Sequence, residues 1–241
     1  MNPPRFSEEP RFADRHEAGR RLAGAVRTRL AGAAGPLLVL GLPRGGVPVA
    51  WEVAQALAAP LDVLLVRKLR APGQPELGLG AVVDAAPRPQ VVLNDELVRA
   101  VGASPRYLED EVRQQQAAIE QRRQLYRAAA PQQPVSGRTV VLVDDGIATG
   151  TTVRAAIRAV RQRQPTRLVL AVPVAPASEL RSLRAEVDEL VCLDAPAFFG
   201  SVGSHYRLFG QTSDEEVVAL MDESGRHGRP LAAGAMQDPR R

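Results

Sequence analysis

Apolar residues are spaced in two ways along this chain, and the spacing predicts alternating strands and helices. Short, mostly apolar segments of strand length occur at residues 37–42, 61–66, 140–143, 168–172 and 187–193. Segments between them repeat their apolar residues every three or four positions, as amphipathic helices do. Mostly apolar strands that alternate with helices are typical of a parallel sheet covered on both faces. The pattern therefore predicts an α/β, doubly wound fold with a mostly parallel sheet of about five strands.

Helices are predicted at residues 12–31, 47–58 and 151–162. A longer and very polar helix is predicted after Ser104, which would be its N-cap, with Pro105 at the first helical position. Such polarity is expected of a lid, an arm or a helix that faces a partner.

Segments rich in proline and glycine divide the rest of the chain. Residues 71–80 contain two Pro and three Gly and are predicted to form a loop. We expect a single domain over residues 1–222, with a helical insertion at 85–130 and a candidate hood at 194–222. Residues 223–241, which are rich in Gly and Arg, are expected to be a disordered tail.

The composition argues against membrane and exported proteins. No apolar run approaches the roughly 20 residues that a membrane span requires, and the first ten residues lack the apolar core of a signal peptide. Cys192 is the single cysteine and cannot form an internal disulfide, which fits a reducing compartment. We therefore expect a cytoplasmic protein with no membrane partner.

The charge balance is basic, with 31 Lys and Arg against 27 Asp and Glu and a pI of about 9.9. Clustered arginines would favour nucleic acid, because they neutralise phosphates. Here acidic residues are interleaved with the basic ones, and Lys68 is the single lysine, which is more typical of codon bias than of a binding face. Nucleic acid is therefore the less favoured partner.

The most informative stretch is residues 140–152, VVLVDDGIATGTT. It places Asp144 and Asp145 at the carboxyl end of a buried strand, directly before a Gly/Thr-rich turn that opens a helix. Backbone N–H groups at a helix start form an anion site, to which the threonines add hydroxyl donors. Paired carboxylates suit sugar hydroxyls or Mg²⁺. A ligand with one phosphate and a neighbouring diol would satisfy both halves.

Other interpretations of this stretch are weaker. A P-loop requires a lysine after its second glycine, and none is present here. Phosphoacceptor domains also carry an acidic pair after a strand, but they lack the Thr-Gly-Thr-Thr turn. A surface turn capped by Asp would explain two isolated aspartates but not thirteen residues in this order.

The stretch resembles the 5-phosphoribosyl-1-pyrophosphate (PRPP) signature of type I phosphoribosyltransferases. The resemblance implies that Asp144 and Asp145 hold the ribose 2′- and 3′-hydroxyls and are candidate Mg²⁺ ligands, directly or through water. It also implies a loop around the 5′-phosphate of PRPP, formed by Ala148, Thr149, Gly150, Thr151 and Thr152.

Two further segments resemble the same family. The turn after the first strand resembles the pyrophosphate loop, which would consist of Pro43, Arg44, Gly45 and Gly46. Lys68, after Arg67 at the end of the next predicted strand, resembles the start of a mobile loop over residues 67–80 that closes on PRPP. Taken alone, the turn 43–46 could equally be an ordinary strand-to-helix turn, and the pair Arg67-Lys68 could equally be a solvated strand end. All three segments follow strand carboxyl ends, where open α/β sheets bind ligands.

The resemblance covers about residues 12–220, and the segments 75–82 and 198–203 resemble a bacterial subgroup of predicted phosphoribosyltransferases with an unassigned acceptor. It implies a Mg²⁺-dependent enzyme that transfers the phosphoribosyl group of PRPP to a nitrogen acceptor, releasing pyrophosphate. The family commonly forms homodimers. The implied catalytic residues are Arg44, Lys68, Asp144 and Asp145.

The acceptor, expected to be a nucleobase, stays open. Ala148 stands where 6-oxopurine enzymes have Asp, and no lysine follows the loop as it does in those enzymes. Ala-Thr-Gly resembles adenine enzymes, whereas Pro-Arg-Gly-Gly resembles xanthine–guanine enzymes. His205 and Tyr206 are candidates to contact a base, with ordinary packing as the favoured alternative. A different class of function, a PRPP-sensing regulator that binds DNA or RNA, is motivated by the basic pI and the arginine-rich long helix.

Overall fold

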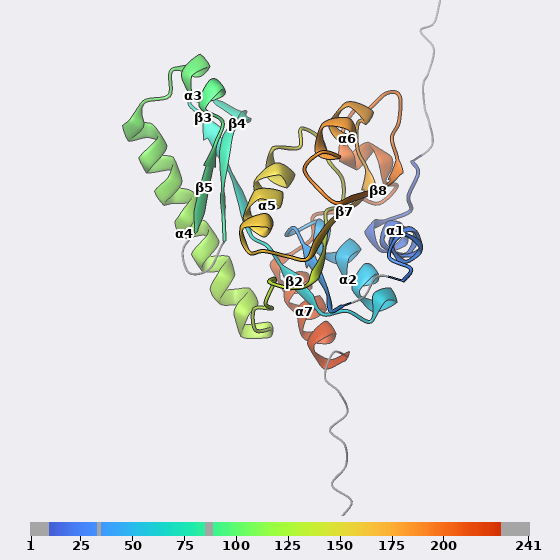
Figure 1. Ribbon diagram of the computed structural model, residues 1–241. Coiled ribbons are helices and arrows are strands. Elements are labelled where there is room, and N and C mark those ends of the chain that lie inside the picture. The colour runs from blue at the N-terminus through green and yellow to red at the C-terminus, as the bar shows by residue number, and fades with distance from the viewer. Residues whose placement is uncertain (1–9, 33–34, 85–88, 228–241) are drawn as a thin grey trace, which may run out of the picture.

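The main body of the protein is a five-stranded parallel sheet in the order β2-β1-β6-β7-β8 (Figure 1). The computed structural model describes residues 10–32, 35–84 and 89–227. Its parallel strands are β1 (Leu37–Gly41), β2 (Leu61–Val63), β6 (Thr139–Val143), β7 (Arg167–Val174) and β8 (Glu189–Asp194). This confirms the predicted α/β fold with about five parallel strands.

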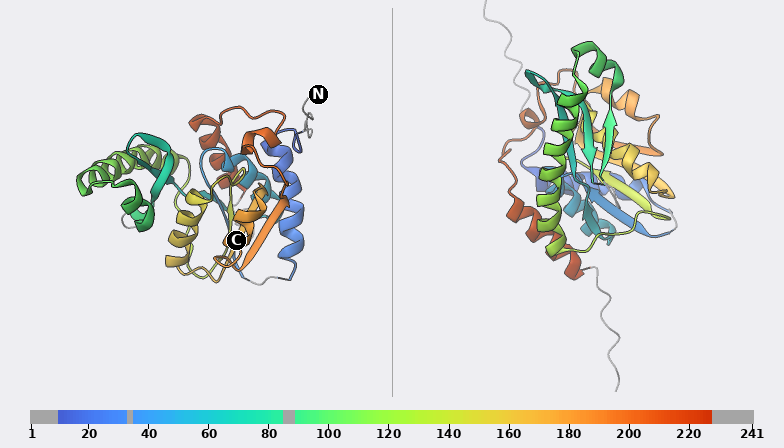
Figure 2. Two further views of the ribbon diagram at one scale, coloured as in Figure 1. Left: turned by 90° about the horizontal axis from the view of Figure 1, so that it is seen from above. Right: turned by 90° about the vertical axis from the view of Figure 1, so that its left-hand side faces the viewer.

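Helices cover both faces of this sheet, as a doubly wound fold requires (Figure 2). One face packs against α1 (Arg15–Arg29), α2 (Gly46–Leu57) and α7 (Asp214–His227), and the other against α5 (Thr151–Gln162) and α6 (Ala177–Leu183). Successive strand residues alternate between the two cores: Val141 packs in the first and Leu142 in the second. This explains why apolar residues occupy consecutive positions in the central strands.

The register of the two central strands positions the functional loops. β1 and β6 are parallel neighbours, paired from Leu37 opposite Thr139 to Gly41 opposite Val143. Both strands therefore end at the same level, and the loops that follow them start side by side at the carboxyl edge of the sheet.

A second, antiparallel sheet contradicts two of the predictions. It contains β3 (Val66–Ala71), β4 (Gln74–Val83) and β5 (Gln90–Leu93). The apolar run 61–66 is not one strand, because β2 ends at Val63 and β3 begins in the other sheet. Residues 71–80, predicted to be a loop, lie mostly in β4, so the segment 67–80 is a β-hairpin with its turn at residues 72–73.

Close packing explains why glycine-rich sequence forms a strand here. A Cβ on Gly80 would lie 2.1 Å from the carbonyl oxygen of Val92 in β5, and one on Gly78 would lie 3.0 Å from Lys68 Cδ. The pairing of β3 with β4 is also irregular on both sides of Arg70. Glycine in this sequence therefore marks a close approach between strands and an irregular ladder, not a loop.

The predicted long helix is confirmed as α4 (Pro105–Ala129), which follows α3 (Asp95–Val101) and packs against β3 and α7. Ser104 Oγ caps it by accepting a hydrogen bond from the Tyr107 backbone N–H, 3.2 Å away.

At the other end of the chain, α7 continues to His227, so the first residues of the expected tail 223–241 are helical. Residues 228–241 of that tail lie outside the described residues. Among the helices described, none combines the length and apolar character needed to cross a bilayer.

Candidate active site

Asp144 and Asp145 lie at the carboxyl end of β6, mostly buried, with the Asp145 side chain 14% exposed. The Asp145 backbone N–H donates a hydrogen bond to Asp144 Oδ1, 2.9 Å away. Burial raises the pKa of both carboxyl groups, and repulsion from Asp145 raises the pKa of Asp144 further. Two adjacent carboxyl groups that resist joint ionisation favour a cation or hydroxyl donors beside them.

Arg15 is a partner of this pair that the sequence analysis missed. Its Nε donates to Asp145 Oδ2 at 2.8 Å and its Nη1 to the carbonyl oxygen of Gly210 at 2.7 Å. The guanidinium also stacks on Phe209, with Cζ 3.9 Å from the ring centroid. Its charge opposes the rise in the pKa of Asp145. Arg15 is 130 positions from Asp145 in sequence, so no local pattern indicated the contact.

The segment after β8 closes over the turn that follows the acidic pair. The Tyr206 hydroxyl donates to the carbonyl oxygen of Asp145, 2.5 Å away, and burial raises the pKa of that hydroxyl. Val202, in the short helix η1 (Val202–His205), covers Gly146, where an added Cβ would meet Val202 Cγ1 at 2.6 Å. His205 is buried and stacks on Phe199, with ring centroids 5.2 Å apart. His205 and Tyr206 therefore pack within the protein. This agrees with the ordinary packing that the sequence analysis favoured over contact with a base.

The turn between β1 and α2 touches the acidic pair directly. A Cβ on Gly45 would lie 2.1 Å from Asp145 Oδ2, and one on Gly46 would lie 2.9 Å from Asp144 Cα. The backbone of the predicted pyrophosphate loop can approach this closely only because these two residues lack side chains. The peptide bond between Pro43 and Arg44 in the same turn is cis.

The Arg44 side chain, by contrast, points toward α7. Its Nη1 lies 3.8 Å from Asp214 Oδ2. Asp214 also pairs with Arg122 Nε at 3.3 Å and accepts a hydrogen bond from the Tyr126 hydroxyl. The structure therefore brings the backbone of residues 43–46 to the aspartates but directs the Arg44 guanidinium to a different carboxylate.

Lys68 lies within β3, paired opposite Ala81, and not at a strand end as predicted. It nevertheless shares a cavity of about 200 Å³ with Asp144 and with all of the predicted phosphate loop, residues 148–152. In that loop Gly150 has a left-handed conformation, with φ +70°, and caps α5. The Thr149 and Thr151 hydroxyl oxygens lie 3.5 Å apart. The predicted cation and the predicted phosphate loop thus line one cavity.

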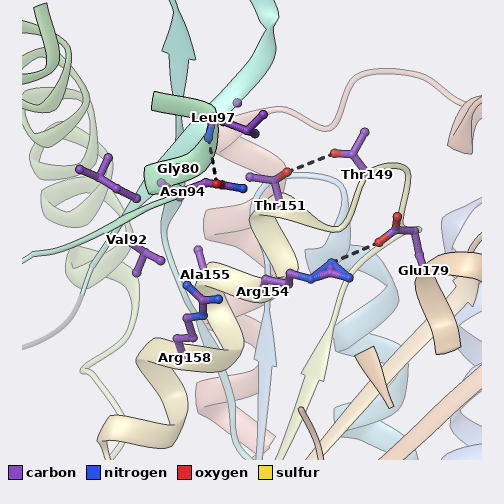
Figure 3. Close-up of a pocket in the computed structure, with 13 residues that line it drawn as sticks. Gly80, Val92, Asn94, Leu97, Thr149, Thr151, Arg154, Ala155, Arg158 and Glu179 are labelled. Atoms are coloured by element: carbon purple, nitrogen blue, oxygen red, sulfur yellow. Dashed lines mark hydrogen bonds and ion pairs between the residues drawn. The ribbon is translucent and has the colours of Figure 1, made fainter. Parts of the chain in front are cut away.

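A second cavity, of about 350 Å³, borders the same loop between α5 and the strands β4 and β5 (Figure 3). Thr149 and Thr151 line both cavities. Arg154 at the rim is held by Glu179, with Nη1 3.2 Å from Oε2, whereas Arg158 projects from the next turn of α5. The predicted phosphate loop therefore borders two cavities.

The donor set at the acidic pair fits Mg²⁺ and does not resemble a closed metal site. No group of three or more His, Cys, Asp or Glu side chains suitable for a metal occurs in the described part of the chain. Mg²⁺ is commonly held by one or two carboxylates together with substrate phosphates and water. Asp144 and Asp145 supply two such carboxylates, and a cation beside them would relieve the repulsion that raises the pKa of Asp144.

Fold and site together define an α/β protein with its ligand site at the carboxyl edge of a parallel sheet. The model of the family described as phosphoribosyl transferase domain matches residues 13–207. The chain belongs to this family, which confirms the resemblance of the strand-end motifs.

Two relatives support the assignment at high similarity. The Mycobacterium tuberculosis protein named "Putative phosphoribosyl transferase Rv0571c" is 46% identical over 215 residues, 89% of this chain. That alignment covers 47% of the mycobacterial protein, so the chain spans about half the length of this relative. The solved structure of TT1426 from Thermus thermophilus is 45% identical, has a TM-score of 0.74 and covers 88% of this chain and 98% of that one.

Proposed function

We propose that this protein transfers the 5-phosphoribosyl group from PRPP to a nitrogen acceptor and releases pyrophosphate. The observation that supports this most strongly is the meeting of the turn after β1, the loop after β6 and Lys68 of β3 at one place. The turn 43–46 contacts Asp144 and Asp145, and Asp144 shares a cavity with Lys68 and the loop 148–152. PRPP matches this arrangement, with its 5′-phosphate at residues 148–152, its ribose hydroxyls at the two aspartates and its anionic leaving group at the turn 43–46.

In the proposed reaction the acceptor nitrogen attacks C1′ as the bond from C1′ to pyrophosphate breaks. Asp144 and Asp145 hold the ribose hydroxyls, while residues 148–152 bind the 5′-phosphate through backbone N–H and threonine hydroxyl donors. Negative charge develops on the departing pyrophosphate, and we assign its neutralisation to the backbone of residues 43–46, the Lys68 ammonium and the Arg44 guanidinium. The protein therefore acts mainly by positioning and by charge stabilisation.

Mg²⁺ is the proposed cofactor, with Asp144 and Asp145 as its protein ligands, directly or through water. When bound it would neutralise charge on the pyrophosphate group. The two carboxylates are suited to this because each is buried with its pKa raised, so a nearby cation favours their ionised forms.

A nucleobase is the proposed acceptor, within nucleotide metabolism in the cytoplasm. We also propose a homodimer built from a single domain over residues 1–222, with residues 85–130 as an insertion and 194–222 contributing the hood. The packing of Val202 over Gly146 supports the position of the hood beside the acidic pair.

The regulatory alternative, with nucleic acid as partner, finds no support in the charges of α4. Most of its arginines are already paired with acids: Arg113 with Asp110, Arg122 with Asp214, Arg123 with Glu120 and Arg127 with Asp62. A helix whose guanidinium groups are neutralised in this way does not present the unpaired basic stripe that phosphate backbones require.

A pyrophosphate-release screen tests the proposal. The protein is incubated with PRPP and Mg²⁺ and with purine bases, pyrimidine bases or other nitrogen acceptors, and released pyrophosphate is measured. We expect release with one acceptor class, and a higher melting temperature with PRPP and Mg²⁺ even without acceptor. A protein that PRPP does not stabilise and that releases no pyrophosphate with any acceptor would refute the function.

A further inference from the structure

Two arginines from different elements pair with Asp214, beside the turn 43–46, and a third arginine lies close to them. Arg44 from that turn and Arg122 from α4 both pair with the Asp214 carboxylate, at 3.8 and 3.3 Å. Arg67, from β3, is close enough to both arginines and to Asp214 for their charges to influence its pKa. The cluster therefore joins the predicted pyrophosphate loop to the small sheet, to the long helix and to α7.

The charges in this cluster do not balance. Two guanidinium groups, those of Arg44 and Arg122, share the Asp214 carboxylate, and Arg67 carries a third positive charge close to them. One Asp214 oxygen also accepts the hydrogen bond of the buried Tyr126 hydroxyl. Arg67 Nε is buried and has no hydrogen-bond partner among the described residues. Burial and the charge of Arg122 lower the pKa of Arg67. Such an excess of positive charge favours binding of an anion with more charge than one carboxylate.

The position of the cluster indicates which anion this is. Arg44 is continuous in the chain with Gly45 and Gly46, which touch the acidic pair. Guanidinium groups bind phosphate oxygens through two parallel N–H donors, so several arginines around one point suit a diphosphate better than a monophosphate. Pyrophosphate is the part of PRPP that has two linked phosphates.

We propose that Arg67 and Arg122, together with Arg44, bind the pyrophosphate group of PRPP, and that Asp214 holds these arginines until pyrophosphate replaces it. The inference rests on the proposed function and extends it to residues of β3, α4 and α7. Asp214 is then a positioning residue that competes with the ligand, and α4 contributes Arg122 to the site.

Opposite effects of two substitutions test this proposal. Arg122→Gln removes a cation that binds pyrophosphate, and its affinity for inorganic pyrophosphate with Mg²⁺ should fall about tenfold. Asp214→Asn removes the competing carboxylate, and the same affinity should rise about two- to fivefold. If the cluster were only structural, both substitutions would weaken binding or leave it unchanged. Binding is measured by titration calorimetry, with ribose 5-phosphate as the second probe.

Matched controls come from the same two helices. Arg113→Gln in α4 and Asp222→Asn in α7 each break an ion pair of the same type on an exposed surface and should leave both affinities unchanged. Ribose 5-phosphate affinity should be unchanged in every variant, which also shows that each variant is folded. If Arg122→Gln does not fold, Arg122→Lys, which keeps the charge but loses the planar fork, should show a smaller loss.

The two possible failures are distinguishable. If the parent protein binds ribose 5-phosphate but Arg122→Gln and Asp214→Asn do not change pyrophosphate affinity in opposite directions, the assignment of the cluster is wrong and the proposed function stands. If the parent protein binds neither ribose 5-phosphate nor PRPP, the proposed function fails and this inference fails with it.

Discussion

The acidic and the basic halves of the candidate site are built in different ways. Asp144, Asp145 and the phosphate loop come from thirteen consecutive residues at the end of one central strand. The cations come from distant elements: Arg15 from α1, Arg44 from the turn after β1, Lys68 from β3 and Arg122 from α4. The acidic half is a local feature of the sequence, whereas the basic half exists only after folding.

The difference also determines what each half does without ligand. The acidic half holds two carboxyl groups whose ionised forms are destabilised by burial, so it favours an external cation. The basic half already has a carboxylate, Asp214, between its arginines. A bound cation would therefore add to the Arg15 pairing on the acidic side, whereas on the basic side the proposed anion would replace Asp214.

Removing the acidic half should have the largest effect. The double substitution Asp144→Asn and Asp145→Asn deletes both carboxylates with little change of shape, and we expect kcat/KM for PRPP to fall about 10³-fold. Stabilisation by PRPP and Mg²⁺ in thermal unfolding should disappear. Asp110→Asn, at an exposed ion pair on α4, serves as the control and should leave both readouts at parent values. Residual stabilisation by PRPP in the double variant would show that the acidic half is not the ribose site.

Separating the two halves by steric means should have the next largest effect. In Gly45→Ala the new methyl group would overlap Asp145 Oδ2, at 2.1 Å, so either the turn or the Asp145 carboxylate must move. We expect a loss of about 10²-fold in kcat/KM, the size typical of a misplacement of about 1 Å.

Gly24→Ala in α1 is the matched control, because nothing lies within 4 Å of the added carbon. It should keep full activity and gain about 0.5–1 kcal/mol of stability, as is usual for alanine in a helix. Equal activity of the two alanine variants would argue against direct contact between turn and acidic pair in the working enzyme.

Arg15 tests whether the acidic half needs a partner from outside its own motif. Arg15→Gln removes a charge that lowers the pKa of Asp145, so this carboxyl stays protonated to higher pH. PRPP affinity at neutral pH should fall about tenfold, and its loss on acidification should begin at higher pH than in the parent. Arg20→Gln, at an exposed pair on the same helix, should leave the pH profile unchanged. Identical profiles in all three proteins would mean that Asp145 is not the group that titrates.

The sequence predicted the acidic half almost completely, because its signal is local. The apolar strand, the adjacent acids and the Thr-Gly-Thr-Thr turn all occur in the predicted order, and α5 begins and ends where predicted. The parallel sheet was predicted because its strands are mostly apolar at consecutive positions. These features depend on neighbouring residues, which periodicity and motif spacing describe well.

The basic half and the small sheet were predicted less well, for two physical reasons. Gly78 and Gly80 looked like loop residues, but the close approach of Lys68 and Val92 requires them within strand β4. The pairs Arg15–Asp145 and Arg122–Asp214 form through contacts between distant elements, which no local pattern encodes. Sequence did place Arg44 and Lys68 near the site, but not the Arg44 side chain against α7.

The smallest expected effect concerns the free energy of unfolding of the free protein, which the two buried carboxyl groups lower at neutral pH. A carboxyl whose pKa is raised by folding contributes stability below its unfolded pKa, and this contribution is lost as the pH rises through the folded value. Both aspartates fall in this class. In EDTA, the double Asn variant should therefore match the parent near pH 4 and become progressively more stable than it toward pH 8. A difference of about 1 kcal/mol would raise the melting temperature by about 2–4 °C for a domain of this size. A variant that loses stability relative to the parent as the pH rises would show that the carboxylates are already satisfied in the free protein, and that the contrast between the two halves is wrong.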